Sequence, residues 1–575
     1  TSSGYFKNQG VDIMAFDDIY PEGHQGGVCI IMNGHRVATN GDIRLEATPG
    51  QWQPVPKQLD RKLGDNSITA TLCYPDSSRH LTGFNPMIYP NLHLIYTVNV
   101  ESKGKNIEVT VDLDRPIPQE FIGKVGFNLE FFPGSLFGKP WIMDGQSGIF
   151  PQQPNSPLMT TQPNYLHTGN YHDGKKSLAD MDKLIGKGYS PIVADDIISE
   201  PYAKGTKFTS RPDDPYNKVT IESLSGDLQL FDGRMNHNNG WFVLRSNIKP
   251  GVTKGAVKWI ITPNVVADWM YQPVIQTSQI GYHPTQDKEA VIEMDIRDNR
   301  KETAQIIRID ADGEKVVKNV TPANWGKFLR YNYLKVNFTD VKEPGLYKIK
   351  YNTSVSPIFR IDNDVYARGV WQPVLEYFLP VQMCHMRVNE KYRVWHDCCH
   401  MDDAQMAPAH NHIDGYDQKE GLSKFKPGEV VPGVNIGGWH DAGDFDLRIE
   451  SQAGESYILA LAYEAFHPNL DVTSIDQINR VTEIHQPDGK NDLLQQVENG
   501  ALTVVNGYLA LGRLYRGIIC NDLRQYVLLG DAAAMTDGKI GNEDDRWIFT
   551  EDNPGRELST AAQLAAVSRV LKGFN

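Results

Sequence analysis

Residues Gly437–Asp446 read GGWHDAGDFD, and this stretch decides how the second half of the chain is interpreted. Two carboxylates, Asp441 and Asp444, stand three residues apart across Ala-Gly. Small residues between them allow a tight backbone path that leaves a cleft floor open to a substrate. A carboxylate in such a place can act as a general base on water if a second carboxyl group serves as acid. The same residue types also form turns and helix caps. The sequence on either side of this stretch is therefore needed to decide between the two interpretations.

The sequence around this stretch has helical periodicity. From about Asn363 onwards, apolar residues recur at helical spacing and long polar loops join the stretches, which predicts amphipathic helices. Four such stretches are present: Val365–Phe378, Ala453–Ala465, Leu493–Leu511 and Glu557–Leu571.

The first ~270 residues instead alternate apolar with polar residues, which is the period of a half-buried strand. Turn residues separate the runs, and many strands of this kind predict a large antiparallel sandwich. A stretch rich in Pro, Gly, Asn and Asp at about 134–216 predicts a long irregular loop. The strand-like runs are Ile68–Tyr74, Leu92–Val100, Ile107–Leu113, Val125–Phe132, Trp241–Ser246 and Ala256–Thr262.

A shorter unit lies between these regions. It opens with QTSQIGYHP at Gln276–Pro284 and closes with EPGLYKIKY at Glu343–Tyr351 and PIFRI at Pro357–Ile361. Its length of about 90 residues fits a small immunoglobulin-like sandwich. The order β, then β, then α favours separate domains. We therefore predict a β-rich domain at 1–272, an immunoglobulin-like domain at 273–362 and a helical domain at 363–575.

Length, charge and hydropathy exclude some classes of protein. The chain has 575 residues, which is too many for one core of roughly 250–300 residues. Its net charge of −14 comes without a Lys/Arg cluster, which argues against nucleic acid as a partner. No apolar run reaches the ~18–20 residues of a membrane span. The chain starts at Thr1 without a basic and apolar leader, so we expect that a signal peptide either was removed or never existed.

Four stretches together resemble glycoside hydrolase family 9. These are GGWHDAGDF with the apolar helix after it, the acidic-Leu-Leu helix start at Asn491–Leu494, the Ala-rich helix within Glu551–Leu571, and QTSQIGYHP at Gln276. The resemblance covers about residues 274–575. It implies an immunoglobulin-like domain followed by an (α/α)6 barrel whose loops form an open groove, and an inverting cleavage of β-1,4-linked or mixed-linkage glucan.

The resemblance also implies residue roles. Asp444 would be the base that activates the attacking water, and Asp441 would orient that water. Inversion requires an acid roughly 6.5–9.5 Å from the base. In the family this acid is a glutamate near the end of the catalytic domain, and no Glu here matches its motif. We therefore expect residues 363–575 to be the front part of the barrel, completed by a C-terminal remainder, and we expect this polypeptide alone not to hydrolyse soluble β-glucan.

A second group of residues suggests a metal. Six cysteines are too few for a disulfide scaffold, and three of them crowd among histidines. The family resemblance implies a structural zinc bound by Cys384, Cys399, His400 and His440, because four Cys and His ligands form a closed tetrahedral site. His410 or His412 could replace His440. The alternative is a Cys384–Cys399 disulfide beside unrelated histidines.

Aromatic and acidic residues supply the remaining candidates. Trp439, Trp547 and Tyr416 are expected in loops of the groove, where aromatic rings stack on the apolar faces of sugars. They could equally pack within their own domain. Calcium is a further possibility at Asp402–Asp403, Asp414–Asp417 and Glu543–Asp545, although none of these has the spacing of a calcium loop.

Alternatives to an endo-acting hydrolase remain open from the sequence. One is an exo-acting member of the family that removes single glucosyl or glucosaminyl units. Another is a carbohydrate-binding protein with an incomplete hydrolase domain, in which residues 1–272 recognise the sugar. A third is an interaction protein stabilised by zinc. Because polysaccharides do not enter the cytoplasm, we expect a secreted, periplasmic or surface location.

Overall fold

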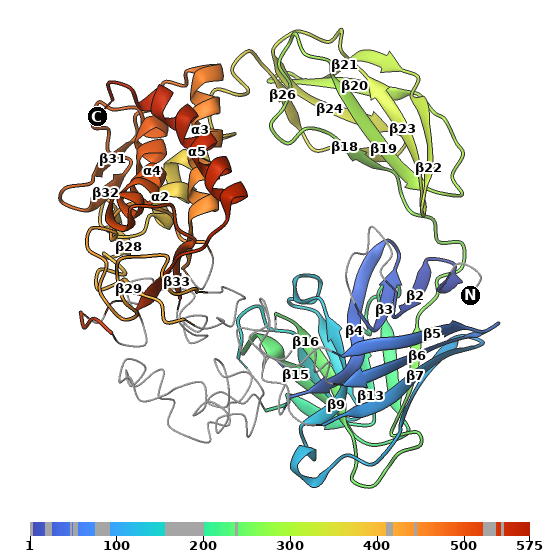
Figure 1. Cartoon of the computed structure of the whole chain (residues 1–575). Coiled ribbons are helices and arrows are strands. Elements are labelled where there is room, and N and C mark those ends of the chain that lie inside the picture. Colours follow the sequence, from blue (N-terminus) through green and yellow to red (C-terminus); the bar gives the residue numbers. More distant parts are fainter. Residues whose placement is uncertain are drawn as a thin grey trace.

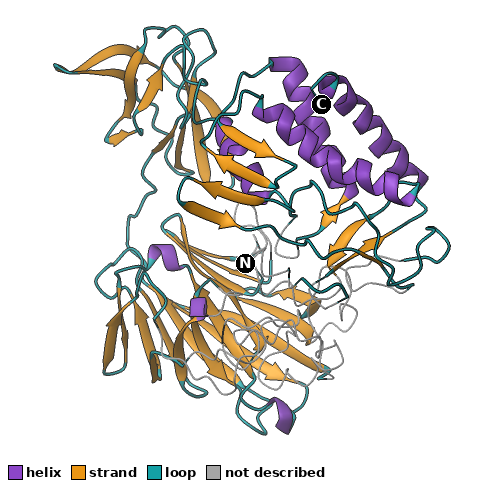
Figure 2. Ribbon diagram, turned by 90° about the vertical axis from the view of Figure 1, so that its left-hand side faces the viewer, coloured by secondary structure: helices purple, strands orange, loops and turns teal. Residues whose placement is uncertain are grey.

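The structure is a computed structural model whose strands and helices fall into three parts with separate hydrophobic cores (Figure 1). Two parts are built from strands, and the long helices gather in the third (Figure 2). The structure describes residues 4–17, 26–46, 49, 56–74, 92–155, 200–235, 240–409, 418–441, 445–520, 536, 538–541 and 545–574.

The N-terminal part consists of two large antiparallel sheets that share one core, because most of their strands turn apolar side chains inward. One sheet has the order β1 (Phe6–Asn8), β2 (Val11–Ala15), β3 (Val28–Met32), β4 (His35–Leu45), β9 (Val125–Phe131), β16 (Phe242–Asn247), β15 (Leu228–Asp232) and β12 (Ala203–Gly205). The other has the order β11 (Gln146–Ile149), β10 (Pro140–Met143), β13 (Lys207–Ser210), β14 (Val219–Ser223), β17 (Val257–Pro263), β8 (Asn106–Leu113), β7 (Leu94–Lys103), β6 (Ser67–Tyr74) and β5 (Lys57–Leu63).

The six strands predicted from alternation are present as β6, β7, β8, β9, β16 and β17. The prediction of one long loop over 134–216 is wrong at both ends, because β10 to β13 lie there. These strands are three or four residues long, and only a few inward side chains such as Trp141 and Met143 mark them, so the turn residues around them hide the pattern. Residues 156–199 of that stretch lie outside the described residues.

The second part is a small sandwich of two sheets around its own core, as the sequence predicts for an immunoglobulin-like unit. One sheet has the order β18 (Val274–Gln276), β19 (Glu289–Asp295), β23 (Tyr331–Asn337) and β22 (Ala323–Phe328). The other has the order β21 (Gly313–Val320), β20 (Ala304–Asp310), β24 (Gly345–Tyr351) and β25 (Ser354–Val355), and β26 (Phe359–Ile361) also pairs with β24.

The third part contains three of the four predicted helices. The Asn491 side chain accepts hydrogen bonds from the first backbone amides of α4 (Asp492–Leu511), and Gly512 ends that helix in the left-handed conformation. The Asn553 side chain likewise accepts a hydrogen bond from the Arg556 amide in the first turn of α5 (Pro554–Leu571). Both helices pack against α3 (Ile449–Phe466).

The first predicted helix, Val365–Phe378, is too long. Only a π-helical turn (Val374–Phe378) and α2 (Leu379–Gln382) form, because Gly369 has a left-handed backbone at φ 74° and Pro373 lacks an amide hydrogen. Since the described residues of this part hold three long helices, the (α/α)6 barrel stays a prediction.

Two small four-stranded sheets accompany these helices, and the sequence did not predict them. One has the order β28 (Arg393–His396), β27 (Arg387–Glu390), β32 (Val481–Ile484) and β31 (Thr473–Asp476). The other has the order β29 (Gln405–Met406), β34 (Arg546–Phe549), β33 (Gly517–Cys520) and β30 (Leu447–Arg448). Among the described residues, no helix is both long and apolar enough to cross a membrane.

Two helix glycines test how tightly this part packs. A Cβ on Gly500 of α4 would collide with the Trp439 ring and the Ser456 hydroxyl, whereas a Cβ on Gly454 of α3 would meet its nearest atom at 3.8 Å. Gly500→Ala should therefore destabilise the protein by about 1–3 kcal/mol through overpacking. Gly454→Ala is the matched control and should stabilise it by about 0.5–1 kcal/mol, because Ala favours a helix.

Thermal and urea unfolding of both variants measures these differences. If Gly500→Ala were as stable as Gly454→Ala, the close approach of α4 to Trp439 would be wrong.

Candidate functional site

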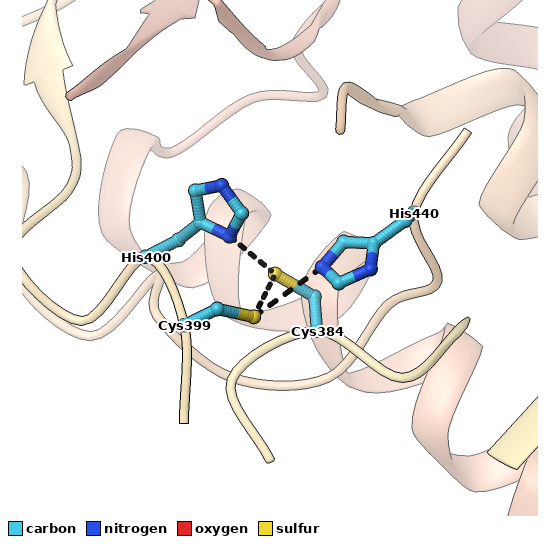
Figure 3. A group of neighbouring side chains, drawn as sticks. All are labelled: Cys384, Cys399, His400 and His440. Atoms are coloured by element: carbon cyan, nitrogen blue, oxygen red, sulfur yellow. Dashed lines mark hydrogen bonds between the residues drawn. The ribbon is translucent and has the colours of Figure 1, made fainter. Parts of the chain in front are cut away.

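Four side chains from three separate segments meet at one buried point (Figure 3). Cys384 follows α2, Cys399 and His400 follow β28, and His440 belongs to the GGWHDAGDFD stretch. One ligand atom from each lies within 4.8 Å of all the others, and no side chain of the four is more than 7% exposed. The structure thus brings together the four residues that the sequence predicted as metal ligands.

The separations suit a tetrahedral metal site. The two Sγ atoms are 3.9 Å apart, Cys384 Sγ is 3.5 Å from His400 Nδ1, and Cys399 Sγ is 3.3 Å from His440 Nε2. Bonds of about 2.3 Å to sulfur and 2.0–2.1 Å to nitrogen place tetrahedral donors roughly 3.3–3.8 Å from each other. A disulfide would need the two sulfurs at about 2.05 Å, and both cysteines are free thiols here.

The other cysteine and histidine side chains near the cluster have different partners. Cys398 Sγ points to the Arg480 carbonyl, at 3.7 Å. His396 has each ring nitrogen within 3.0 Å of a backbone carbonyl, and His385 Nδ1 lies 3.0 Å from the Gly437 carbonyl. His410 and His412, the alternatives to His440, lie outside the described residues.

Arg546 supplies a positive charge to the cluster, and it was not predicted from the sequence. Its guanidinium lies 3.4 Å from Cys384 Sγ, pairs with the Asp403 carboxylate at 2.6 Å, and donates to the Phe445 carbonyl. Burial alone would raise the pKa of Cys384, but the hydrogen bond with Cys399 and the Arg546 charge hold that pKa well below its ordinary value. The only sequence signal for Arg546 was its position beside Trp547.

The two imidazoles are held in the form that binds metals. Burial, followed by the charge of Arg546, lowers the pKa of His400 well below its ordinary value. Burial also lowers the pKa of His440. Neutral imidazole and thiolate are the metal-binding forms, so the surroundings favour coordination over protonation of the histidines.

The loop that carries His440 is fixed by amide side chains of two helices. Gln452 of α3 bonds both the backbone N–H and the carbonyl of Trp439, at 2.8 and 3.0 Å. On α4, Gln496 accepts from the Trp439 indole at 2.8 Å, and Asn499 donates to the Gly438 carbonyl at 3.1 Å. These buried amides were also missed from the sequence, where polar residues in a helix suggest an exposed face.

Asp441 follows His440 directly and is exposed to solvent. Arg448 stands beside it, with 3.3 Å between Nε and the Asp441 carboxylate, and the Asp441 amide bonds the Asp446 carbonyl at 3.2 Å. Asp444, the predicted base, lies outside the described residues.

A cavity of about 360 Å³ opens beside Asp441. Withdrawal from water at its wall, and then the negative charge of Asp441, raise the pKa of Glu455 on α3. The cavity thus combines two carboxyl groups with apolar and aromatic walls, a mixture suited to an organic ligand with polar groups. Its wall includes Phe378, Leu379, Trp439, His440, Gln452 and Ile458.

The predicted aromatic platforms lie in different settings. Trp439 lines the cavity but is 2% exposed, which leaves little ring face for stacking. Trp547 is half-buried and lies in strand β34, not in a loop as predicted, and it packs near Phe549. Tyr416 lies outside the described residues.

The acidic clusters give no calcium site in the part that the structure describes. Asp403 is engaged by Arg546, and Asp402 accepts a hydrogen bond from the Gly538 amide at 2.6 Å. Asp414, Asp417 and Glu543 lie outside the described residues, so calcium stays a prediction.

Comparison with known proteins identifies the middle part of the chain. Residues 270–356 match the cellulase N-terminal ig-like domain. The chain therefore contains the immunoglobulin-like domain that is found in cellulases, at the position where the sequence predicted it. A comparison with curated protein sequences gives no match.

Solved structures show weaker likenesses. A Zn-binding triple mutant of the family 9 endoglucanase J30 is 19% identical (51% of this chain, 53% of that chain, TM-score 0.36). A family 9 protein of Bacteroides ovatus is 17% identical (52% and 54%, TM-score 0.33). A galactose mutarotase related enzyme of Lactobacillus acidophilus is 9% identical (46% and 98%, TM-score 0.24). The aligned part spans about half the length of the first two proteins.

Proposed function

We propose that the chain is part of an inverting glycoside hydrolase of the family 9 type that cleaves β-1,4-linked or mixed-linkage glucan. The main support is that His440 joins a buried Cys/His cluster while the next residue, Asp441, lines an open cavity. This arrangement couples a rigid buried anchor to an exposed carboxylate. A hydrolase needs such a fixed carboxylate, because misplacement by about 1 Å can cost ~10²-fold in rate.

In this proposal, residues 273–362 are the immunoglobulin-like domain and 363–575 belong to the catalytic domain, preceded by the β-rich part at 1–272. Asp444 takes a proton from the attacking water, and Asp441 orients that water with Arg448 beside it. A second carboxyl group must protonate the leaving oxygen from the other side of the scissile bond, and the family places it in a later segment of the catalytic domain. The substrate, a polysaccharide, places the protein outside the cytoplasm.

The cluster would hold zinc, and zinc would act as a structural ion, since all four positions come from protein side chains. Its chemistry would be to fix the segments that carry Cys384, Cys399 and His440, and thereby the backbone of Asp441. It would not itself contact the sugar.

Adjacent cysteines provide a matched test of the zinc. The purified protein should contain one zinc per chain by elemental analysis, and Cys399→Ser should lose it and unfold at lower temperature, because metal binding contributes to folding. Cys398→Ser should keep both the zinc and the stability, since Cys398 points to a backbone carbonyl instead. Equal zinc loss in the two variants, or no zinc in gently purified protein, would contradict the assignment.

The base is tested by Asp444→Asn in the natural protein acting on soluble β-glucan. Loss of a general base should lower kcat by about 10²–10⁴-fold and leave substrate binding nearly unchanged. NMR of the first products should show the α-anomer, as inversion of a β-linkage requires.

Asp312→Asn is the control for this substitution, because Asp312 is an exposed carboxylate in the immunoglobulin-like part. Its activity should equal that of the natural protein. Unchanged activity in Asp444→Asn would rule out the proposed base.

A further inference from the structure

The outward face of one sheet in the immunoglobulin-like part carries an unusual set of side chains. Strand alternation sends Ile292 and Leu334 into the core, where both are buried. Tyr331 and Tyr333 of β23 therefore point outward, and Glu293 of β19 stands opposite Tyr333 on that same face. This sheet, with strands β18, β19, β23 and β22, is labelled in Figure 1.

Five aromatic rings follow each other along this face and the segment that leads into it. Neighbouring ring centroids are separated by 6.4, 5.3, 6.0 and 5.5 Å. The last ring is 56% exposed and sits at a register shift in β22, where a bulge re-aims a side chain. In order, the aromatic row is Trp269, Tyr271, Tyr331, Tyr333 and Trp325.

A single carboxylate holds two of these rings in place. Glu293 accepts hydrogen bonds from the Tyr271 hydroxyl at 2.9 Å and from the Tyr333 hydroxyl at 3.1 Å. Burial and the Glu293 carboxylate raise the pKa of Tyr271, so its hydroxyl stays a donor. Rings fixed in this way lose little freedom when a ligand stacks on them, which favours binding.

The row ends in a cavity of about 390 Å³ between the immunoglobulin-like part and two hairpin turns of the N-terminal sheet. The turn glycines, Gly10 and Gly34, have left-handed backbones at φ 67° and 82°. A Cβ on either would come within 2.9 Å of the Trp269 or Tyr271 ring, so only glycine allows this close approach.

Polar groups surround the aromatic rings of the cavity. Arg330 pairs with Asp12 across the two parts at 3.4 Å, and Gln9 donates to the Trp269 carbonyl at 3.0 Å. Lys7 also lines the cavity. Donors and acceptors thus stand beside flat apolar rings.

We propose that the aromatic row and its cavity bind a single chain of a neutral, β-linked glucan oligosaccharide. A sugar ring has a flat C–H face for stacking and a rim of hydroxyls for hydrogen bonds, and the row offers both partners. The charges of the cavity wall are paired, Asp12 with Arg330 and Asp295 with Arg297, which suits a neutral ligand better than a polyanion. The choice of a β-linked glucan rests on the proposed function, whereas the binding itself is separate from hydrolysis.

The angles between neighbouring rings favour a single glucan chain over the flat surface of crystalline cellulose as the ligand. Neighbouring rings of the row are inclined to one another by 58–88°. Rings so inclined cannot all lie flat on one plane, whereas a single chain can rotate between successive sugars. The ligand is therefore a soluble chain and not the surface of crystalline cellulose.

The test measures binding of cellohexaose to the whole chain by titration calorimetry, in an Asp444→Asn background so that no hydrolysis can interfere. Trp325→Ala and Tyr333→Ala should each weaken the binding event at the row about 10-fold and leave the event beside Asp441 unchanged, because one stacking contact contributes roughly a factor of ten. Tyr392→Ala is the control, since Tyr392 is a fully exposed aromatic away from the row, and it should bind like the parent.

Further measurements distinguish a soluble glucan from crystalline cellulose and from a second copy of the chain. Binding to soluble β-glucan with no retention on microcrystalline cellulose is the expected pattern. Unchanged cellohexaose affinity in both row variants would overturn the proposal. A dimer in sedimentation that Trp325→Ala dissociates would also overturn it, because the row would then be a contact between two copies of the chain.

Discussion

The C-terminal part depends on the burial of two thiols and two imidazoles at one point. Polar groups removed from water are costly unless they find partners, and here the partners come from each other and from Arg546. The segments of Cys384 and His440 also meet through their backbones, since the Cys384 amide bonds the Gly438 carbonyl at 2.9 Å and the His440 amide bonds the Gln382 carbonyl at 2.8 Å. The cluster therefore lies where these two paired segments meet the segment of Cys399 and His400.

The loop beside the cluster is constrained from its other side as well. Gln452, Gln496 and Asn499 bond its backbone and its tryptophan, so the loop is fixed by the cluster on one side and by two helices on the other. Neutral amides suit this task, because each supplies both a donor and an acceptor without burying a charge. The exposed Asp441 thus emerges from a rigid base, which is the requirement for a carboxylate that must orient water.

Much of the fold and of the candidate site could be predicted from the sequence. The features that were not predicted have common physical causes. Regular alternation predicted the long strands such as β6 to β8, and apolar spacing predicted α4 and α5, since these signals are local. The crowding of Cys and His indicated a metal site, and the family resemblance supplied the four members, including the distant His440. Arg546 and the helix amides were missed because their role arises only from contacts across distant segments. The two small sheets were missed because their strands have two to four residues, and Trp547 was misplaced with them.

The immunoglobulin-like part joins the other two and shares a polar and aromatic contact with the N-terminal sheet through Arg330 and Asp12. The C-terminal part depends most on the Cys384, Cys399, His400 and His440 cluster, for which we propose zinc. X-ray absorption at the zinc edge of the purified protein tests this proposal most directly. We predict two sulfur neighbours at about 2.3 Å and two nitrogen neighbours at about 2.0–2.1 Å. A shell of oxygen ligands, or a shell with a single sulfur, would contradict it.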